Sequence, residues 1–342
     1  MNGSLSQGLE WLGTKGNQIV SQTTGYQVLL KGVNRSGLEY SVPGASGFLA
    51  SAGITQHEIR QIVQSWGAKV IRLPFNQDWA LNGCGEQSSE AYLSAIDQVI
   101  DWAAELGCYT LLDLQWLDST TAYGNLHDGT ANFVAPLPNR STVDLWTMLA
   151  KRYRDEPAVL FDLFNEPHNR LDDDPHPLCL VAFDGTIYES DQQDVRPEEW
   201  LPWVRLLVDS IRAVHSQSLI WVPGVDWAYD LRGIELDAPN IVYSTHVYPN
   251  RLRWHWRSRF GYVAEDKPLF IGEFGGGSGD LEWGERLMGF ISEKACGWTA
   301  WSWADHPRLV ENAQRGDQTP TLFGDFVRRA LVRTKAAAAT SS

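Results

Sequence analysis

The stretch AVLFDLFNEPH (158–168) decides how the rest of this sequence is interpreted. Its apolar half, 158–164, is typical of a short buried strand. Pro167 cannot continue a strand, and it keeps Glu166 out of the α region, so the strand ends at Asn165 and Glu166. Core packing does not require a carboxylate there. Glu166 is therefore either a catalytic group or a structural one that caps a helix or pairs with an arginine.

This strand is one of a series of strand–helix units. Strand-like apolar runs occur at 28–33, 70–73, 108–114, 159–164, 219–222, 241–247, 268–272 and 297–301. Helical segments are predicted at 55–66, 88–106, 142–153, 197–215, 253–264, 281–294 and 321–333. Strands that alternate with helices predict a parallel sheet. Eight units in about 300 residues fit a closed barrel better than an open doubly wound sheet.

The predicted fold class is thus α/β, a single (β/α)8 TIM barrel with additions. The catalytic domain is expected to span 1–335, followed by a disordered low-complexity tail at 336–342. Alternation around Thr24-Gly25 in 17–33 predicts an N-terminal β-hairpin. Two long βα-loop insertions, 117–140 and the acidic 166–196, are expected to wall the cleft at the strand ends.

Composition narrows the possible partners. The 342 residues carry a net charge of −14, which disfavours nucleic acid and anionic membranes as partners. No GxGxxG or Walker motif follows a strand, and no cysteines have CxxC spacing, so neither a nucleotide cofactor nor a metal is predicted. A monomer is expected. No stretch has the length of a transmembrane helix.

Of the four cysteines, Cys108 and Cys296 are expected to be buried thiols. Cys108 and Cys296 begin apolar runs. Cys84 and Cys179 lie in loop-like segments, so a disulfide between them is possible but not determined by the sequence.

Tryptophan is unusually abundant, with 16 residues. Several tryptophans lie beside turn residues and not inside apolar runs. They indicate either an aromatic-rich core or exposed rings that stack on sugars. Trp79, Trp116 and Trp227 are the candidate platforms.

Polar and aromatic residues gather at the predicted strand ends. They are Arg72, Gln115, Trp116, Asn165, Glu166, His246, Tyr248, Glu273 and Trp301. In a (β/α)8 barrel these ends meet at one face, which is where such proteins carry their active sites. Two glutamates in one cleft are the requirement for cleaving a glycosidic bond.

The motifs FNEP (164–167), HVY (246–248), GEFG (272–275), RLP (72–74) and AWSW (300–303) together resemble glycoside hydrolase family 5. The resemblance spans nearly the whole chain in the family's order, and it implies a retaining β-glycosidase on a (β/α)8 barrel. One position departs from the family pattern. The family usually has a histidine after the third strand's Asp-Leu, where this chain has Gln115.

The resemblance also implies a role for each matched residue. Glu166 corresponds to the acid/base and Glu273 to the nucleophile. Arg72 would support the nucleophile, and Asn165 would bind the sugar 2-hydroxyl. His246 and Tyr248 match the pair after the sixth strand, with the tyrosine near the nucleophile. Trp301 matches the sugar platform, with Trp303 as the alternative.

In a retaining pair the carboxyl groups lie about 5–5.5 Å apart. Ionised Glu273 would then raise the pKa of Glu166, while Arg72 would hold Glu273 ionised. One carboxyl group would be a proton donor and the other a nucleophile at the same pH.

The leading hypothesis is a retaining endo-β-1,4-glucanase acting on a β-linked oligo- or polysaccharide. A β-mannanase, a β-1,3-glucanase and an exo-acting β-glycosidase remain open, because loops decide among them. A non-catalytic carbohydrate-binding barrel would be expected to lack one glutamate. A barrel aldolase would need a strand-end lysine. The N-terminus (1–11) has no recognisable signal peptide, yet a polymer substrate favours secretion, so an extracellular location is expected with a cytoplasmic one left open.

Overall fold

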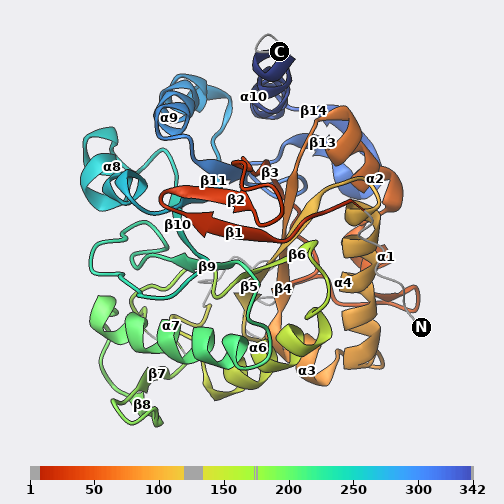
Figure 1. Ribbon diagram of the computed structural model, residues 1–342. Helices are drawn as coiled ribbons and strands as arrows, with labels where there is room; N and C mark the ends of the chain where they lie inside the picture. The colour runs from red at the N-terminus through yellow and green to blue at the C-terminus, as the bar shows by residue number, and fades with distance from the viewer. Residues whose placement is uncertain (1–7, 119–133, 173, 175, 340–342) are drawn as a thin grey trace.

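The computed structural model describes residues 8–118, 134–172, 174 and 176–339. Eight parallel strands close into a barrel in which each strand pairs with the next and the last pairs with the first (Figure 1). They are β3 (Lys31–Asn34), β4 (Val70–Asn76), β5 (Tyr109–Trp116), β6 (Val159–Asp162), β9 (Ile220–Pro223), β10 (Ile241–Val247), β11 (Leu269–Phe274) and β12 (Gly297–Ala300). The predicted (β/α)8 barrel is confirmed.

Helices surround the barrel (Figure 1). Within the described residues, the α-helices are α1 (Gly47–Ala52), α2 (Gln56–Arg60), α3 (Gln77–Asn82), α4 (Ser89–Ala104), α6 (Arg140–Arg152), α7 (Pro197–Arg212), α8 (Arg253–Arg259), α9 (Leu281–Lys294) and α10 (Leu322–Ala339). Four short helical segments also occur in the described residues. One is a π-helix, η1 (Gln61–Ser65), and three are 3-10 helices, η2 (Gly261–Glu265), η3 (Ser278–Asp280) and η4 (Ala313–Arg315). A small hairpin, β13 (Val310–Asn312) with β14 (Asp317–Pro320), precedes α10. No helix in the described part of the chain is long and apolar enough to cross a membrane.

The N-terminal hairpin exists, but its turn is earlier than predicted. Strands β1 (Leu12–Lys15) and β2 (Gln18–Ser21) pair around Gly16, whose φ of 56° favours glycine. The Thr24-Gly25 segment forms a separate turn after β2. Leu12 and Ile19 pack against side chains inside the barrel, so the hairpin closes the end opposite the strand C-termini (Figure 1).

Strand β4 is longer than predicted, because it continues through Pro74 to Asn76. Its pairing with β3 ends at Arg72, so the later residues pair with β5 alone. A missing backbone N–H at Pro74 therefore costs little, since that part of β4 has a neighbour on one side only. Arg72 lies before this extension, in the part of β4 that pairs with both neighbouring strands.

The insertion after β6 contains a hairpin that the sequence did not reveal. It consists of β7 (Leu178–Val181) and β8 (Ile187–Ser190), and Trp203 of α7 donates from Nε1 to the carbonyl of Cys179, 2.8 Å away. All four cysteines are free thiols, and the predicted burial of Cys108 and Cys296 is confirmed. The possible Cys84–Cys179 disulfide is not formed, because Cys179 belongs to β7, which packs on α7.

Candidate active site

Arg72 is the fully buried centre of the site. Its guanidinium contacts three carboxylates at 2.8–2.9 Å, those of Asp113 on β5, Asp162 on β6 and Glu273 on β11. It also donates to the side-chain oxygens of Asn34 and Asn165, each at 3.0 Å. Arginine suits this position because its planar fork presents five donors. Five strands or strand ends are thereby joined through one side chain.

Both oxygens of Glu273 accept hydrogen bonds. Arg72 Nη1 donates to Oε1 at 2.8 Å, and the Tyr248 hydroxyl donates to Oε2 at 2.6 Å. The Glu273 side chain is only 5% exposed. Contacts of this kind hold a carboxyl group in one orientation.

Glu166 lies in a different environment. His246 Nδ1 is 2.8 Å from its Oε1, and its side chain is 19% exposed. Burial raises the pKa of Glu166 to about 7, against the opposing effect of Arg72 and Arg251. The raised pKa was predicted, but its cause is different, since the dominant effect is burial and not repulsion by Glu273.

His246 is held neutral. Burial lowers its pKa to about 3. Its ring fits against β11 because position 272 is glycine. A Cβ at Gly272 would lie 2.8 Å from Nε2 of His246 and 2.6 Å from the hydroxyl of Ser244. A neutral imidazole can share a hydrogen bond with Glu166 without fixing the carboxyl as an anion.

Three side chains could each offer one metal-ligating atom within 4.8 Å of the others, namely those of Glu166, His246 and Glu273. They are the one group of such residues in the described ranges that could hold a metal ion. The three side chains already hydrogen-bond to each other, to Arg72 or to Tyr248. The absence of a metal requirement stays a prediction.

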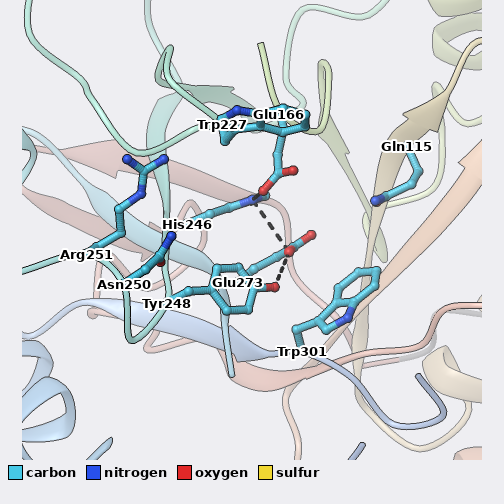
Figure 2. A pocket seen from close by; sticks show the side chains of 9 residues that line it. All are labelled: Gln115, Glu166, Trp227, His246, Tyr248, Asn250, Arg251, Glu273 and Trp301. Atoms are coloured by element: carbon cyan, nitrogen blue, oxygen red, sulfur yellow. Dashed lines mark hydrogen bonds and ion pairs between the residues drawn. The ribbon is translucent and has the colours of Figure 1, made fainter. Parts of the chain in front are cut away.

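A pocket of about 480 Å³ opens above these carboxyl groups. It is lined by Gln115, Glu166, Trp227, His246, Tyr248, Asn250, Arg251, Glu273 and Trp301. Figure 2 shows Trp301 and Gln115 on one side of Glu273, and Asn250 and Arg251 on the other. The buried Oε1 of Gln115 has no hydrogen-bond partner among the described residues.

Trp227 is presented to the pocket by a strained turn. Asp226, Trp227 and Ala228 have φ values of 56°, 60° and 58°, in the left-handed region that non-glycine residues avoid. Arg251 holds the turn by donating to the carboxylate and the carbonyl of Asp226, each at 2.8 Å. The Trp227 ring stacks on His168 with centroids 3.7 Å apart. Such strain persists only where the surroundings impose it, as they often do at functional sites.

The structure brings most of the predicted site residues together. Seven line the pocket, while Arg72 and Asn165 lie beneath it. The prediction for Trp79 is wrong, because it is 1% exposed and packs in the core with Phe48 and Tyr92. Trp116 is 8% exposed, packs near Tyr40 and does not line the pocket. Trp303 is buried, which leaves Trp301, the residue directly after β12, in the pocket.

Sequence reasoning missed five residues of the site: Asn34, Asp113, Asp162, Asn250 and Arg251. A signal for two of them was present. Asp113 and Asp162 are charged residues in otherwise apolar strands, LLDL and LFDL. Buried aspartates are rare unless they are paired, so each implied a cationic partner inside the barrel.

Replacing Arg72 with alanine is expected to lower the free energy of unfolding by about 3–5 kcal/mol, because the buried acidic cluster around it loses its cation. Urea denaturation followed by circular dichroism would measure the loss. The exposed Arg205→Ala on α7 is the control and should change stability little. Equal stability of the two variants would contradict this view of the cluster.

Comparison with known proteins supports the class that this barrel and its paired carboxyl groups define. The family model for cellulase (glycosyl hydrolase family 5) matches residues 28–307. An endoglucanase of Paenibacillus polymyxa is 25% identical, covering 92% of this chain and 82% of the relative. Endoglucanase E-5 of Thermobifida fusca is 23% identical over 74% of the chain, which spans about half (49%) of that relative's length.

Solved structures agree on the fold. The β-glucanase SdGluc5_26A of Saccharophagus degradans, solved in complex with cellotetraose, has a TM-score of 0.71 at 22% identity, covering 98% of this chain and 97% of that one. The cellulase Cel5C_n has a TM-score of 0.68 at 21% identity, covering 97% of this chain and 94% of that one. The fold and the site define a glycoside hydrolase. The chain belongs to glycosyl hydrolase family 5.

Proposed function

We propose that the chain cleaves β-1,4-linked glucan by double displacement, with Glu273 as nucleophile and Glu166 as acid/base. The observation that carries this proposal is the contrast between the two carboxyl groups. Glu166 has a pKa raised to about 7, whereas Glu273 accepts hydrogen bonds from Arg72 and Tyr248 on both oxygens. One is suited to give a proton, and the other to act as an anion.

The separation of the carboxyl groups supports retention of configuration. An oxygen of Glu166 and an oxygen of Glu273 lie within 4.8 Å. Inverting enzymes need roughly 6.5–9.5 Å between the carboxyl groups to admit a water, and retaining enzymes about 5–5.5 Å. The shorter separation leaves room for direct attack by Glu273 on the sugar.

In the first step, a Glu273 oxygen forms a bond to the anomeric carbon as the glycosidic C–O bond breaks. Glu166 gives its proton to the departing oxygen, so the leaving sugar departs as a neutral alcohol. Tyr248 and Arg72 keep the Glu273 carboxylate oriented. Because Arg72 holds Oδ1 of Asn165, the amide nitrogen is the end that can donate to a sugar hydroxyl.

In the second step, Glu166 has lost its proton and acts as a base. It takes a proton from a water, whose oxygen attacks the anomeric carbon and displaces Glu273 as a carboxylate. Glu166 is then protonated again and the cycle is complete. Neutral His246 can keep its hydrogen bond to Glu166 in both protonation states.

The pocket has features suited to glucose units. Trp301 and Trp227 offer aromatic faces, and Gln115 offers a buried oxygen without a partner among the described residues. The endoglucanase relatives and the β-glucanase solved with cellotetraose support a β-glucan substrate. A relative from Xanthomonas campestris, 24% identical over 90% of this chain, is called a major extracellular endoglucanase, which supports secretion.

A substrate panel tests the proposal. Reducing-sugar release should be highest on carboxymethylcellulose, compared with mannan, laminarin and aryl-β-glycosides. A rapid fall in viscosity relative to reducing ends would indicate endo action, and NMR of the first product should show the β-anomer. Faster release from mannan or laminarin would contradict the β-1,4-glucan assignment while leaving the two-carboxylate chemistry intact.

The pH dependence of kcat/KM is expected to have an alkaline limb near pH 7. The active form carries a proton on Glu166, whose pKa is about 7, so activity should fall about tenfold per pH unit above that value. Rates on cellotetraose between pH 5 and about 9 would show the limb. The assignment would be contradicted if the same limb remained in Glu166→Gln.

A further inference from the structure

The buried cluster around Arg72 contains more negative charge than one arginine can balance. Arg72, Asp113 and Asp162 are all fully buried, and Glu273 is 5% exposed. Three ionised carboxylates and one guanidinium would leave two net negative charges inside the barrel. Buried charges without a counter-ion are strongly disfavoured, so the cluster is expected to hold a proton.

Hydrogen bonding distinguishes the three carboxyl groups. Asp162 Oδ2 accepts a well-aligned hydrogen bond from Arg72 Nε at 2.9 Å, and Glu273 accepts from Arg72 and Tyr248. Asp113 lies 2.8 Å from Arg72 Nη2, yet neither of its oxygens accepts a well-aligned hydrogen bond from a described residue. Arg72 Nη2 donates instead to Asn165. The carboxyl group least stabilised as an anion is therefore that of Asp113.

We propose that Asp113 carries the proton of this cluster and that Asp162 is the permanent counter-ion of Arg72, positioning it throughout the reaction. The catalytic part of this inference rests on the proposed function. Neither aspartate lines the pocket, so both act through Arg72 as positioning residues. The proton assignment itself does not depend on the substrate.

The electrostatics agree with the geometry. Burial raises the pKa of Asp113 well above its usual range, and Arg72 offsets this only in part. Burial raises the pKa of Asp162 less, to about 6, because Arg72 also donates a hydrogen bond to it. Of the two buried aspartates, Asp113 is therefore the one that more readily holds a proton.

Among the residues that the structure describes, the groups that face the cluster from other strands do not supply a second cation. His246 on β10 is neutral because burial lowers its pKa to about 3. Burial also raises the pKa of Tyr248 well above its usual range, so its hydroxyl stays protonated. Glu39, which follows β3, is a further acid whose charge would raise the pKa of Asp113. Arg72 remains the cation that these acids share.

The counter-ion matters because the charge of Glu273 changes during the reaction. In the resting enzyme Arg72 faces two anions, Asp162 and Glu273. Once Glu273 is bonded to the sugar, its oxygen is part of a neutral ester, and Asp162 alone balances Arg72. Without Asp162, the glycosyl-enzyme would contain an uncompensated guanidinium in the barrel interior.

Asp162 also weakens the electrostatic interaction between Arg72 and Glu273. If Arg72 interacted with Glu273 alone, it would stabilise that carboxylate more strongly. Glu273 would then be a weaker nucleophile in the first step and a better leaving group in the second. The two half-reactions should therefore respond in opposite directions when the charge of Asp162 is removed.

The first experiment uses Asp162→Asn and an aryl β-cellobioside with an activated leaving group. We expect kcat/KM, which reports the first step, to fall roughly three- to tenfold. We expect kcat, limited by the second step for this substrate, to stay unchanged or rise. Equal falls in both constants, or no change in kcat/KM, would overturn the counter-ion role.

The matched control is Glu58→Gln. Glu58 on α2 is a buried carboxylate that accepts from buried Arg35 at 2.8 Å, outside the site. This variant loses the same kind of ion pair, so it should lower thermal stability without changing the ratio of kcat to kcat/KM. If Glu58→Gln also changed the ratio of kcat to kcat/KM, the change seen in Asp162→Asn would report lost stability and not the counter-ion role.

The second experiment needs no Asp162 variant. The unaltered enzyme is trapped with a 2-deoxy-2-fluoro aryl β-cellobioside, and its infrared difference spectrum is recorded against the resting enzyme. An ester carbonyl band without a new carboxylic-acid band is expected, because Asp162 stays ionised. A new acid band would overturn the proposal. Absence of any ester would instead count against the proposed double displacement.

The third experiment concerns the proton alone. The infrared spectrum of the unaltered enzyme minus that of Asp113→Asn, at neutral pH, should show the band of a protonated carboxyl group. If the difference spectrum instead showed the bands of a carboxylate, Asp113 would be ionised in the unaltered enzyme and the assignment would be wrong. This result is independent of turnover, so it stands even if no β-glucan proves to be a substrate.

Discussion

Replacing Glu273 with alanine is expected to lower kcat on cellotetraose by at least about 10⁴-fold, because the variant cannot form the glycosyl ester. Arg72 and Tyr248 donate to this side chain and should stay folded around the space that it leaves. Initial rates from chromatography of the released oligosaccharides would measure the loss. Full activity in this variant would show that the nucleophile has been assigned wrongly.

A small anion should partly restore this variant. Azide or formate can occupy the space of the missing carboxylate and attack an activated aryl β-cellobioside from the same face. Because only one displacement then occurs, the azide product should have the α configuration, which NMR identifies. The exposed Glu285→Ala on α9 serves as the control and should keep its activity.

Replacing Glu166 with alanine is expected to give a loss that depends on the leaving group. On cellotetraose, which needs a proton donor, kcat/KM should fall about 10²–10⁴-fold. On an aryl β-cellobioside whose leaving group needs no proton, the first step should remain fast and the second should be slow. A burst of released phenol, measured by stopped flow, should therefore precede slow turnover.

Azide should accelerate the second step of this variant and give a β-configured product, opposite to the product expected of the Glu273 variant. Glu189→Gln, an exposed substitution on β8 in the same insertion, is the control and should leave both substrates unaffected. Equal losses on the two substrates would be inconsistent with an acid/base role for Glu166. The pair of product configurations thus distinguishes the two glutamates from each other.

The sequence predicted the barrel because its signals are local. Strand ends are marked by prolines and polar residues within a few positions, as in FNEP and GEFG. The C-terminal ends of parallel strands must meet at one face, so side chains such as Arg72, Glu166 and Glu273 could be placed together without coordinates. Where the local signal was ambiguous, as at Thr24-Gly25, the position of the turn was wrong.

The tryptophans show the limit of such reasoning. Trp79 and Trp227 both lie beside turn residues in the sequence. Trp79 packs into the core between Phe48 and Tyr92, whereas a left-handed turn held by Arg251 presents Trp227 to the pocket. Residues far away in the chain make that difference, so no pattern around either tryptophan could reveal it.

The sequence by itself determined the order of the strands, the face that carries the site and the two glutamates at its centre, because each depends on patterns of a few residues. The tertiary structure alone decided how these groups are charged. Barrel closure places Asp113, Asp162 and Glu273, from three strands, around one buried Arg72. Burial raises the pKa of Glu166, and burial depends on all the neighbours of a side chain in space.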